Sequence, residues 1–81
     1  MGRFSRRAAK PAEPEEFRSL TSRERDIFVL AARGLSNAEI AKGEFLSEAT
    51  VKTHISRILG KLGLRDRVQL VVFAFEHGLT A

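Results

Sequence analysis

The sequence predicts an all-α domain, a four-helix bundle that contains a helix-turn-helix. Capping signatures recur along the chain, in which Ser, Thr or Asp stands three positions before Glu or Gln. A single glycine follows each of the apolar segments that these signatures open. The β-branched residues recur at helical spacing and do not alternate, which argues against strands.

Length and composition restrict the function. A chain of 81 residues makes one domain with a thin core. The absence of cysteine excludes disulfides and thiolate zinc sites. No apolar run approaches the roughly 20 residues of a membrane span, so we expect a cytoplasmic protein with no membrane partner. The 14 Lys and Arg exceed the 10 Asp and Glu, and this excess favours a polyanionic partner such as nucleic acid.

Residues 1–16 are predicted to be a basic, proline-containing flexible tail or linker, and residues 17–81 the folded domain. Pro11 and Pro14 disfavour helix in the residues before them. The cations of this segment precede its acids and lie at Arg3, Arg6, Arg7 and Lys10. The segment is either an inert linker or a basic arm that follows DNA phosphates.

The first predicted helix begins at the capping box of Thr21 and Glu24 and ends before Gly34. We expect Glu24 to lie on an ordinary solvated face of this helix.

The second predicted helix is short, about 37–42, and begins at the capping box of Ser36 and Glu39. We expect Gly43 to end it. A short helix, a tight turn and a longer helix form a helix-turn-helix, whose first helix meets the phosphate backbone with its N-terminus. Ser36 and Asn37 lie at that end, where free amides and the helix dipole favour an anion. Simple N-capping by Ser36 is compatible with this interpretation.

The third predicted helix, about 47–62, begins at Ser47 and ends at Gly63. Its apolar residues fall within about 60° of one another on the helical wheel and predict the buried stripe: Val51, Ile55, Ile58 and Leu62, with Leu59 beside them. The opposite face carries the short side chains of Ala49, Thr53, Ser56 and Gly60. Lys52 flanks it on one side, and Thr50, His54, Arg57 and Lys61 on the other. Such a face can approach base edges in a major groove while its cations reach phosphates; the alternative is an ordinary solvated face.

The fourth predicted helix, about 67–77, begins at Asp66 and is apolar on two sides. One side holds Val68, Val71, Val72 and Phe75, and the other holds Leu70, Phe73, Ala74 and His77. A small domain covers only one of them, so the second should be an interface, most simply that of a two-fold homodimer. The alternative is a wholly buried helix that the segment around Phe17 wraps.

The titratable residues argue against an enzyme. The two histidines, His54 and His77, lie on different predicted helices, and no glycine-rich loop is present to cradle a phosphate. We therefore expect no catalytic site, no metal and no cofactor.

Several motifs resemble those of the LuxR/NarL-type (GerE-like) helix-turn-helix domain, as in the effector domain of NarL/FixJ-type response regulators. They are LTSRE at 20–24, GLSNAEIA at 34–41, LSEATVKTH at 46–54, KLG at 61–63 and Arg67. The resemblance covers about residues 20–79. It implies a bacterial transcription regulator that binds double-stranded DNA sequence-specifically at the nucleoid. The third helix would enter the major groove and the fourth would dimerise, with RNA polymerase and a covalently linked receiver or sensor domain as further partners.

The resemblance also assigns the site residues. Base contacts fall on Ala49, Lys52, Thr53 and Ser56; backbone contacts on Ser36, Asn37, Ser47, Thr50, His54, Arg57 and Lys61; and the dimer face on Val68, Val71, Val72 and Phe75. Ser56 stands where some relatives have a longer side chain, so base preference does not carry over. Glu44 stands where relatives commonly have a buried leucine. We expect Glu44 to turn outward and Phe45 or Leu46 to fill the space.

Two other functions remain open at this stage. A sigma-factor region 4-like domain shares parts of the motifs and would bind a promoter as a monomer. A protein-interaction adaptor would keep the scaffold without binding DNA. The second apolar face of the fourth helix argues against the first, and Lys52, Arg57 and Lys61 argue against the second.

Overall fold

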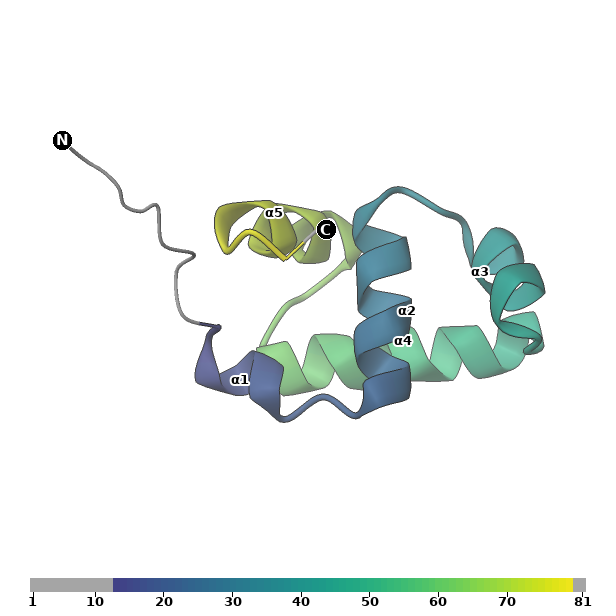
Figure 1. Ribbon diagram of the computed structural model, residues 1–81, viewed down its shortest axis with the longest axis horizontal. Coiled ribbons are helices and arrows are strands. Elements are labelled where there is room, and N and C mark those ends of the chain that lie inside the picture. The colour runs from purple at the N-terminus through teal and green to yellow at the C-terminus, as the bar shows by residue number, and fades with distance from the viewer. Residues whose placement is uncertain (1–12, 80–81) are drawn as a thin grey trace, which may run out of the picture.

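The computed structural model describes residues 13–79, which form five α-helices and no strand (Figure 1). The helices are α1 (Glu15–Arg18), α2 (Ser22–Ala32), α3 (Asn37–Glu44), α4 (Glu48–Leu62) and α5 (Arg67–Glu76). The all-α prediction is confirmed, with α3 and α4 as the helix-turn-helix. The cations of the predicted tail, Arg3, Arg6, Arg7 and Lys10, lie outside the described residues, so the choice between an inert linker and a basic arm stays open.

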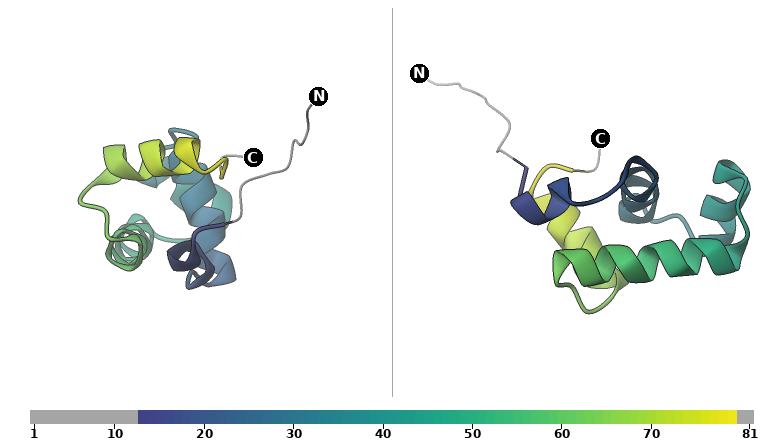
Figure 2. Two further views of the ribbon diagram at one scale, coloured as in Figure 1. Left: turned by 90° about the vertical axis from the view of Figure 1, so that its left-hand side faces the viewer. Right: turned by 90° about the horizontal axis from the view of Figure 1, so that it is seen from below.

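The long helix α4 is the base of the fold (Figure 1). Helix α2 crosses it steeply, while α1 and α3 pack near opposite ends of α4. Helix α5 packs against α2, and the two further views show it displaced to one side of α4 (Figure 2). This arrangement covers one face of α4 and leaves the opposite face open.

The core lies between α2 and the helices that pack around it. Its largest fully buried side chains come from four helices and are Ile27, Phe28, Ile40, Val51, Ile58 and Leu70. The predicted stripe of α4 is confirmed, because Val51, Ile55, Ile58 and Leu62 are all buried. Burial of this stripe fixes the rotation of α4 about its axis and so determines which residues face outward.

Helix α1 was not predicted, and it begins inside the segment that we expected to be tail. Phe17 anchors it: only 4% of this residue is exposed, and its ring packs edge-on against Phe28 with centroids 5.0 Å apart. The guanidinium of Arg25 lies over the Phe17 ring, 4.9 Å from its centroid. This single aromatic residue therefore anchors α1 in the fold. For residues 1–12, the flexible tail stays a prediction.

Each of the helices α2 to α5 is closed by a residue in the left-handed conformation followed by a leucine. The left-handed residues are Gly34, Phe45, Gly63 and Gly78, and the leucines are Leu35, Leu46, Leu64 and Leu79. Each leucine amide donates to the carbonyl five residues earlier, over 2.8–3.2 Å, and each leucine side chain packs on the core. The same closure thus sets the end of four helices.

The turn between α3 and α4 corrects the prediction. Gly43 does not end the helix, which continues to Glu44, and Phe45 takes the left-handed conformation at φ 58°. This register lets Leu46 pack on the core, while Phe45 stays 94% exposed. Leu46 alone therefore fills the space, and Glu44 turns to Arg23, with Oε1 2.6 Å from Nη1.

Candidate nucleic-acid interface

The N-terminus of α4 is fixed by its own side chains. The Thr50 amide donates to Ser47 Oγ at 3.1 Å, and the Ser47 hydroxyl donates to Thr50 Oγ1 at 2.9 Å. Capping at Ser47 sets where the helix starts, and the buried stripe sets its rotation. Ser47 and Thr50, two predicted backbone contacts, are both exposed at this end.

The four predicted base contacts share the outer face of α4. Ala49, Lys52, Thr53 and Ser56 are all exposed, and a shallow hollow is lined by Lys52, Thr53, Ser56 and Arg57. The Thr53 hydroxyl donates to the Ala49 carbonyl at 3.1 Å, which holds this side chain against its own helix. Short side chains therefore occupy the middle of the face and cations its edges.

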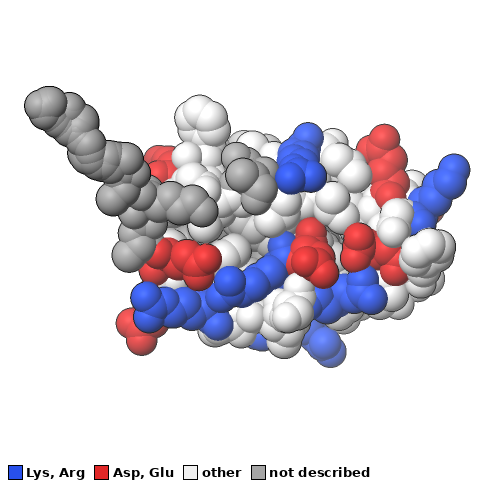
Figure 3. Space-filling model, in the orientation of Figure 1, with Lys and Arg blue, Asp and Glu red and all other residues white. Residues whose placement is uncertain are grey.

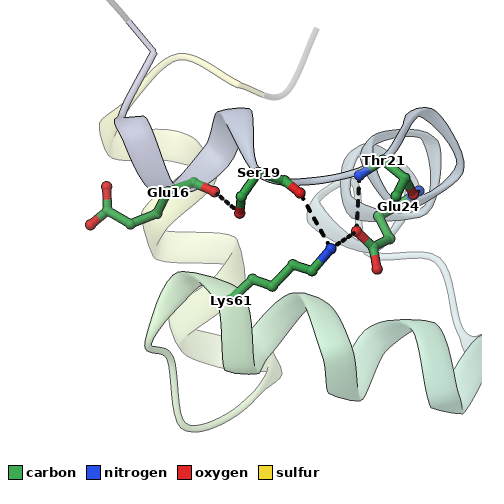
Figure 4. A network of polar contacts seen from close by, with 5 residues as sticks. All are labelled: Glu16, Ser19, Thr21, Glu24 and Lys61. Carbon is green, nitrogen blue, oxygen red and sulfur yellow. Dashed lines mark hydrogen bonds and ion pairs between the residues drawn. The ribbon is translucent and has the colours of Figure 1, made fainter.

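The cations of this face differ in what they contact. Within residues 13–79, neither Lys52 nor Arg57 forms an ion pair. By contrast, Lys61 Nζ lies 2.7 Å from Glu24 Oε1 and donates to the Ser19 carbonyl at 3.2 Å (Figure 4). Lys61 thereby ties the C-terminal end of α4 to α2 and to the segment after α1. The structure brings the other predicted cations to the open face but holds this one against the fold.

Glu24 is the buried partner in this network, so the prediction of a solvated position was wrong. Only 3% of the residue is exposed, and its Oε1 also accepts the Thr21 amide at 2.9 Å. Burial by itself raises the pKa of Glu24. The hydrogen bonds from Lys61 and Thr21, with the positive charges of Lys61 and His54, outweigh that effect and hold the pKa below its usual value. The carboxylate therefore stays ionised inside the fold.

His54, a further predicted backbone contact, is half-buried on α4. Its Nδ1 is buried and has no hydrogen-bond partner among the described residues. His54 is among the groups that lower the pKa of Glu24, so it lies on the side of α4 toward the buried carboxylate.

The start of α3 brings Ser36 and Asn37 together with a residue that sequence reasoning did not place there. Ser36 and Glu39 form the predicted reciprocal capping box, over 3.1 and 2.8 Å. Arg67, the first residue of α5, donates from Nη1 to Asn37 Oδ1 at 2.6 Å and from Nη2 to the Leu35 carbonyl. No local sequence signal could reveal this contact, because Arg67 and Asn37 are 30 residues apart.

Helix α5 exposes the apolar face that the resemblance assigns to the dimer. Val68 is 71% exposed, Val72 49% and Phe75 81%, with Val71 at 36%, whereas Leu70 and Ala74 on the opposite side are buried. Phe17 packs on Phe28 and does not cover this face. Within the described residues, the alternative of a wholly buried helix is therefore wrong.

The charges are unevenly distributed over the molecule. Basic side chains run along the lower part of Figure 3, where α4 lies, with acidic side chains above them and at the lower left, and further basic side chains at the top and at the right-hand end. The open face of α4 itself carries the cations Lys52 and Arg57.

Comparison with known proteins agrees with this arrangement. A model of bacterial regulatory proteins of the luxR family matches residues 18–74. The chain belongs to the luxR family. The response regulator protein VraR of Staphylococcus aureus (strain Mu3) is 49% identical over 65 residues, covering 80% of this chain and 31% of the relative. The VraR proteins of Staphylococcus saprophyticus and Staphylococcus epidermidis align with the same identity and coverage. The chain thus spans about a third of the length of these relatives.

In this luxR-family domain, α3 and α4 are the DNA-binding helix-turn-helix. Among residues 13–79, no group of three or more His, Asp or Glu could hold a metal ion. No helix in the same range is long and apolar enough to cross a membrane.

Proposed function

We propose that the chain is the effector domain of a cytoplasmic two-component response regulator that reads a specific duplex sequence as a homodimer. The observation that supports DNA reading is the composition of the open face of α4. Its centre holds the short side chains of Thr53 and Ser56, and its edges hold Lys52 and Arg57, which have no ion-pair partner among the described residues. A face of this build admits close approach to bases and supplies charge for phosphates.

The proposed contacts divide by chemistry. Lys52, Thr53 and Ser56 meet base edges, and the Ala49 methyl meets a thymine methyl. The backbone contacts are Ser36, Asn37, Ser47, Thr50, His54, Arg57 and Lys61. Two of the three donors of the Lys61 ammonium already serve Glu24 and Ser19, so we assign it the smallest share of phosphate binding.

Dimerisation rests on the apolar face of α5. A two-fold contact would remove Val68, Val72 and Phe75 from water on both protomers at once. Val72→Glu places a charge in the middle of this contact and should abolish dimers without loss of helix in the monomer. Sedimentation and circular dichroism check this expectation; unfolding of the variant would instead make the face part of the core.

The proposed partners are duplex DNA, a second copy of the chain, RNA polymerase and a linked receiver domain. The receiver is included because the VraR relatives are response regulators that extend well beyond the aligned part. No enzymatic activity and no cofactor form part of the proposal.

Selection of binding sites from random duplex DNA, at about 150 mM salt where non-specific binding is weak, tests the proposal. A pair of half-sites is expected. A single half-site would contradict the homodimer and favour a monomeric, sigma-like reader. No enrichment with a folded protein would overturn DNA reading and favour a protein-interaction adaptor. Ser56→Ala should change the selected bases, and Arg57→Ala serves as the matched variant that should leave them unchanged.

A further inference from the structure

Arg67 connects the helix that we propose to dimerise with the helix that we propose to meet the DNA backbone. It is the first residue of α5, and its guanidinium reaches the start of α3. Nη1 donates to Asn37 Oδ1 at 2.6 Å, and Nη2 donates to the Leu35 carbonyl. Both contacts are partly buried, and Arg67 forms no ion pair within residues 13–79.

The chemistry of the pair determines the orientation of the Asn37 amide. A guanidinium carries only donors, so the atom of Asn37 that it meets must be the carbonyl oxygen. The Nδ2 group then points away from Arg67, and it has no hydrogen-bond partner among the described residues. Arg67 thus holds this amide with its two N–H donors unused.

The neighbouring groups determine the charge at this place. The capping box uses the amides of Ser36 and Glu39 and puts the Glu39 carboxylate at the first turn of α3. That negative charge opposes a phosphate. The α3 dipole opposes this effect by adding positive potential at the same helix end, so a phosphate contact here gains from a neutral donor such as the Asn37 amide.

We infer that Arg67 is a positioning residue for DNA binding, which presents Asn37 Nδ2 to a backbone phosphate. The inference rests on the proposed function, because it assumes that the start of α3 meets the duplex. Arg67 acts through Asn37 and does not itself occupy the phosphate. Since Arg67 belongs to α5, the same contact fixes the start of α3 relative to the proposed dimer helix.

A double-mutant cycle on the full chain tests the inference. The variants are Asn37→Ala, Arg67→Ala and their combination, and the probe is a mixed-sequence duplex of about 25 base pairs at low salt. Each single change should weaken binding about three- to tenfold, the usual effect of one lost hydrogen bond. The double variant should be no weaker than the weaker single variant. The slope of log affinity against log salt should not change, because Asn37 is neutral.

Asn37→Asp supplies a second test that does not depend on the stability of Arg67→Ala. The carboxylate keeps an acceptor for Arg67 but loses the donor group. Binding should be at least as weak as that of Asn37→Ala, while the thermal midpoint stays at or above that of the wild type.

Three results would overturn the inference. They are additive losses in the cycle, a salt slope reduced by about 1 in Arg67→Ala, and unchanged affinity in Asn37→Asp. Arg57→Ala separates this failure from failure of the proposed function. If Arg57→Ala weakens binding but Asn37→Asp does not, only the inference fails. If the wild type does not bind duplex DNA, the proposed function fails with it.

Discussion

Arg57 and Lys61 lie one turn apart on the same side of α4, yet they belong to different parts of the molecule. Arg57 is exposed on the open face and has no ion-pair partner in the described part of the chain. Lys61 is bound to the buried carboxylate of Glu24 and to a carbonyl near α1. The position of a residue around a helix axis is therefore not enough to assign its function. What packs against that stretch of helix decides whether a cation is available to bind DNA or stabilises the fold.

The largest expected effect is on the free energy of unfolding, and it follows removal of the Lys61 side chain. Lys61→Ala leaves the Glu24 carboxylate buried without its cation. Loss of one partner of a buried pair costs about 3–5 kcal/mol. Because 36% of the Lys61 side chain is exposed, we expect about 2 kcal/mol in urea unfolding at pH 7. Arg57→Ala is the matched control and should unfold like the wild type.

The same variant should respond differently to acid. In the wild type the pKa of Glu24 is lower in the folded state than in the unfolded state. Its stabilising contribution is therefore complete above the unfolded pKa and is lost as pH falls through the folded pKa. Without Lys61, burial raises the pKa of Glu24, so protonation favours the folded variant. The difference in free energy of unfolding between the two proteins should shrink from pH 7 to pH 3. A constant difference would mean that the loss of stability in Lys61→Ala does not arise from the Glu24 carboxylate.

A smaller effect, on binding alone, is expected at Arg57. Arg57→Ala should weaken binding to every duplex by a similar factor, about five- to tenfold, and reduce the salt slope by about 1. Fluorescence anisotropy titrations at several salt concentrations measure both quantities. A change in sequence preference at unaltered affinity would mean that Arg57 reads bases.

The smallest expected effect lies between the two cations, at Gly60. This residue is exposed within α4, and a Cβ built there meets no atom within 4 Å. Gly60→Ala should raise the free energy of unfolding by about 0.5–1 kcal/mol, because alanine favours helix. Gly63→Ala is the contrasting change, since φ is 67° there and the same substitution should destabilise by about 1 kcal/mol. If Gly60→Ala bound DNA more weakly than the wild type, the DNA interface would reach along α4 toward Lys61.

Contacts within one turn of a helix could be predicted from the sequence. Thr21 with Glu24 and Ser36 with Glu39 form the expected reciprocal bonds, because both partners lie three residues apart. Asp66 likewise accepts the Gln69 amide, although the Gln69 side chain turns to the Arg65 amide. Periodicity also separated the buried stripe of α4 from its open face. Periodicity did not decide which of the two apolar faces of α5 is buried. The resemblance assigned the dimer to one of them, and that face is the exposed one.

Contacts between distant segments could not be predicted. Glu24 meets Lys61 across 37 residues and Asn37 meets Arg67 across 30, and neither pair has a local signature. The turn after α3 was misplaced for a related reason. Glycine is the usual left-handed residue, but here the need to bury Leu46 selects Phe45 for that conformation. Packing overrode the local preference.

The leucine that follows each left-handed residue has a consequence for how fast the chain folds. Each of these four closures spans six residues, so it can form in an otherwise unfolded chain within about a microsecond. The helix ends can therefore form transiently before the helices meet, and helical domains with mostly local contacts fold in microseconds to milliseconds. At the turn before α4, the closing residue is Phe45 and carries a side chain that disfavours the left-handed conformation. We expect that closure to be the least populated of the four before collapse, so that the helix-turn-helix acquires its final geometry late in folding.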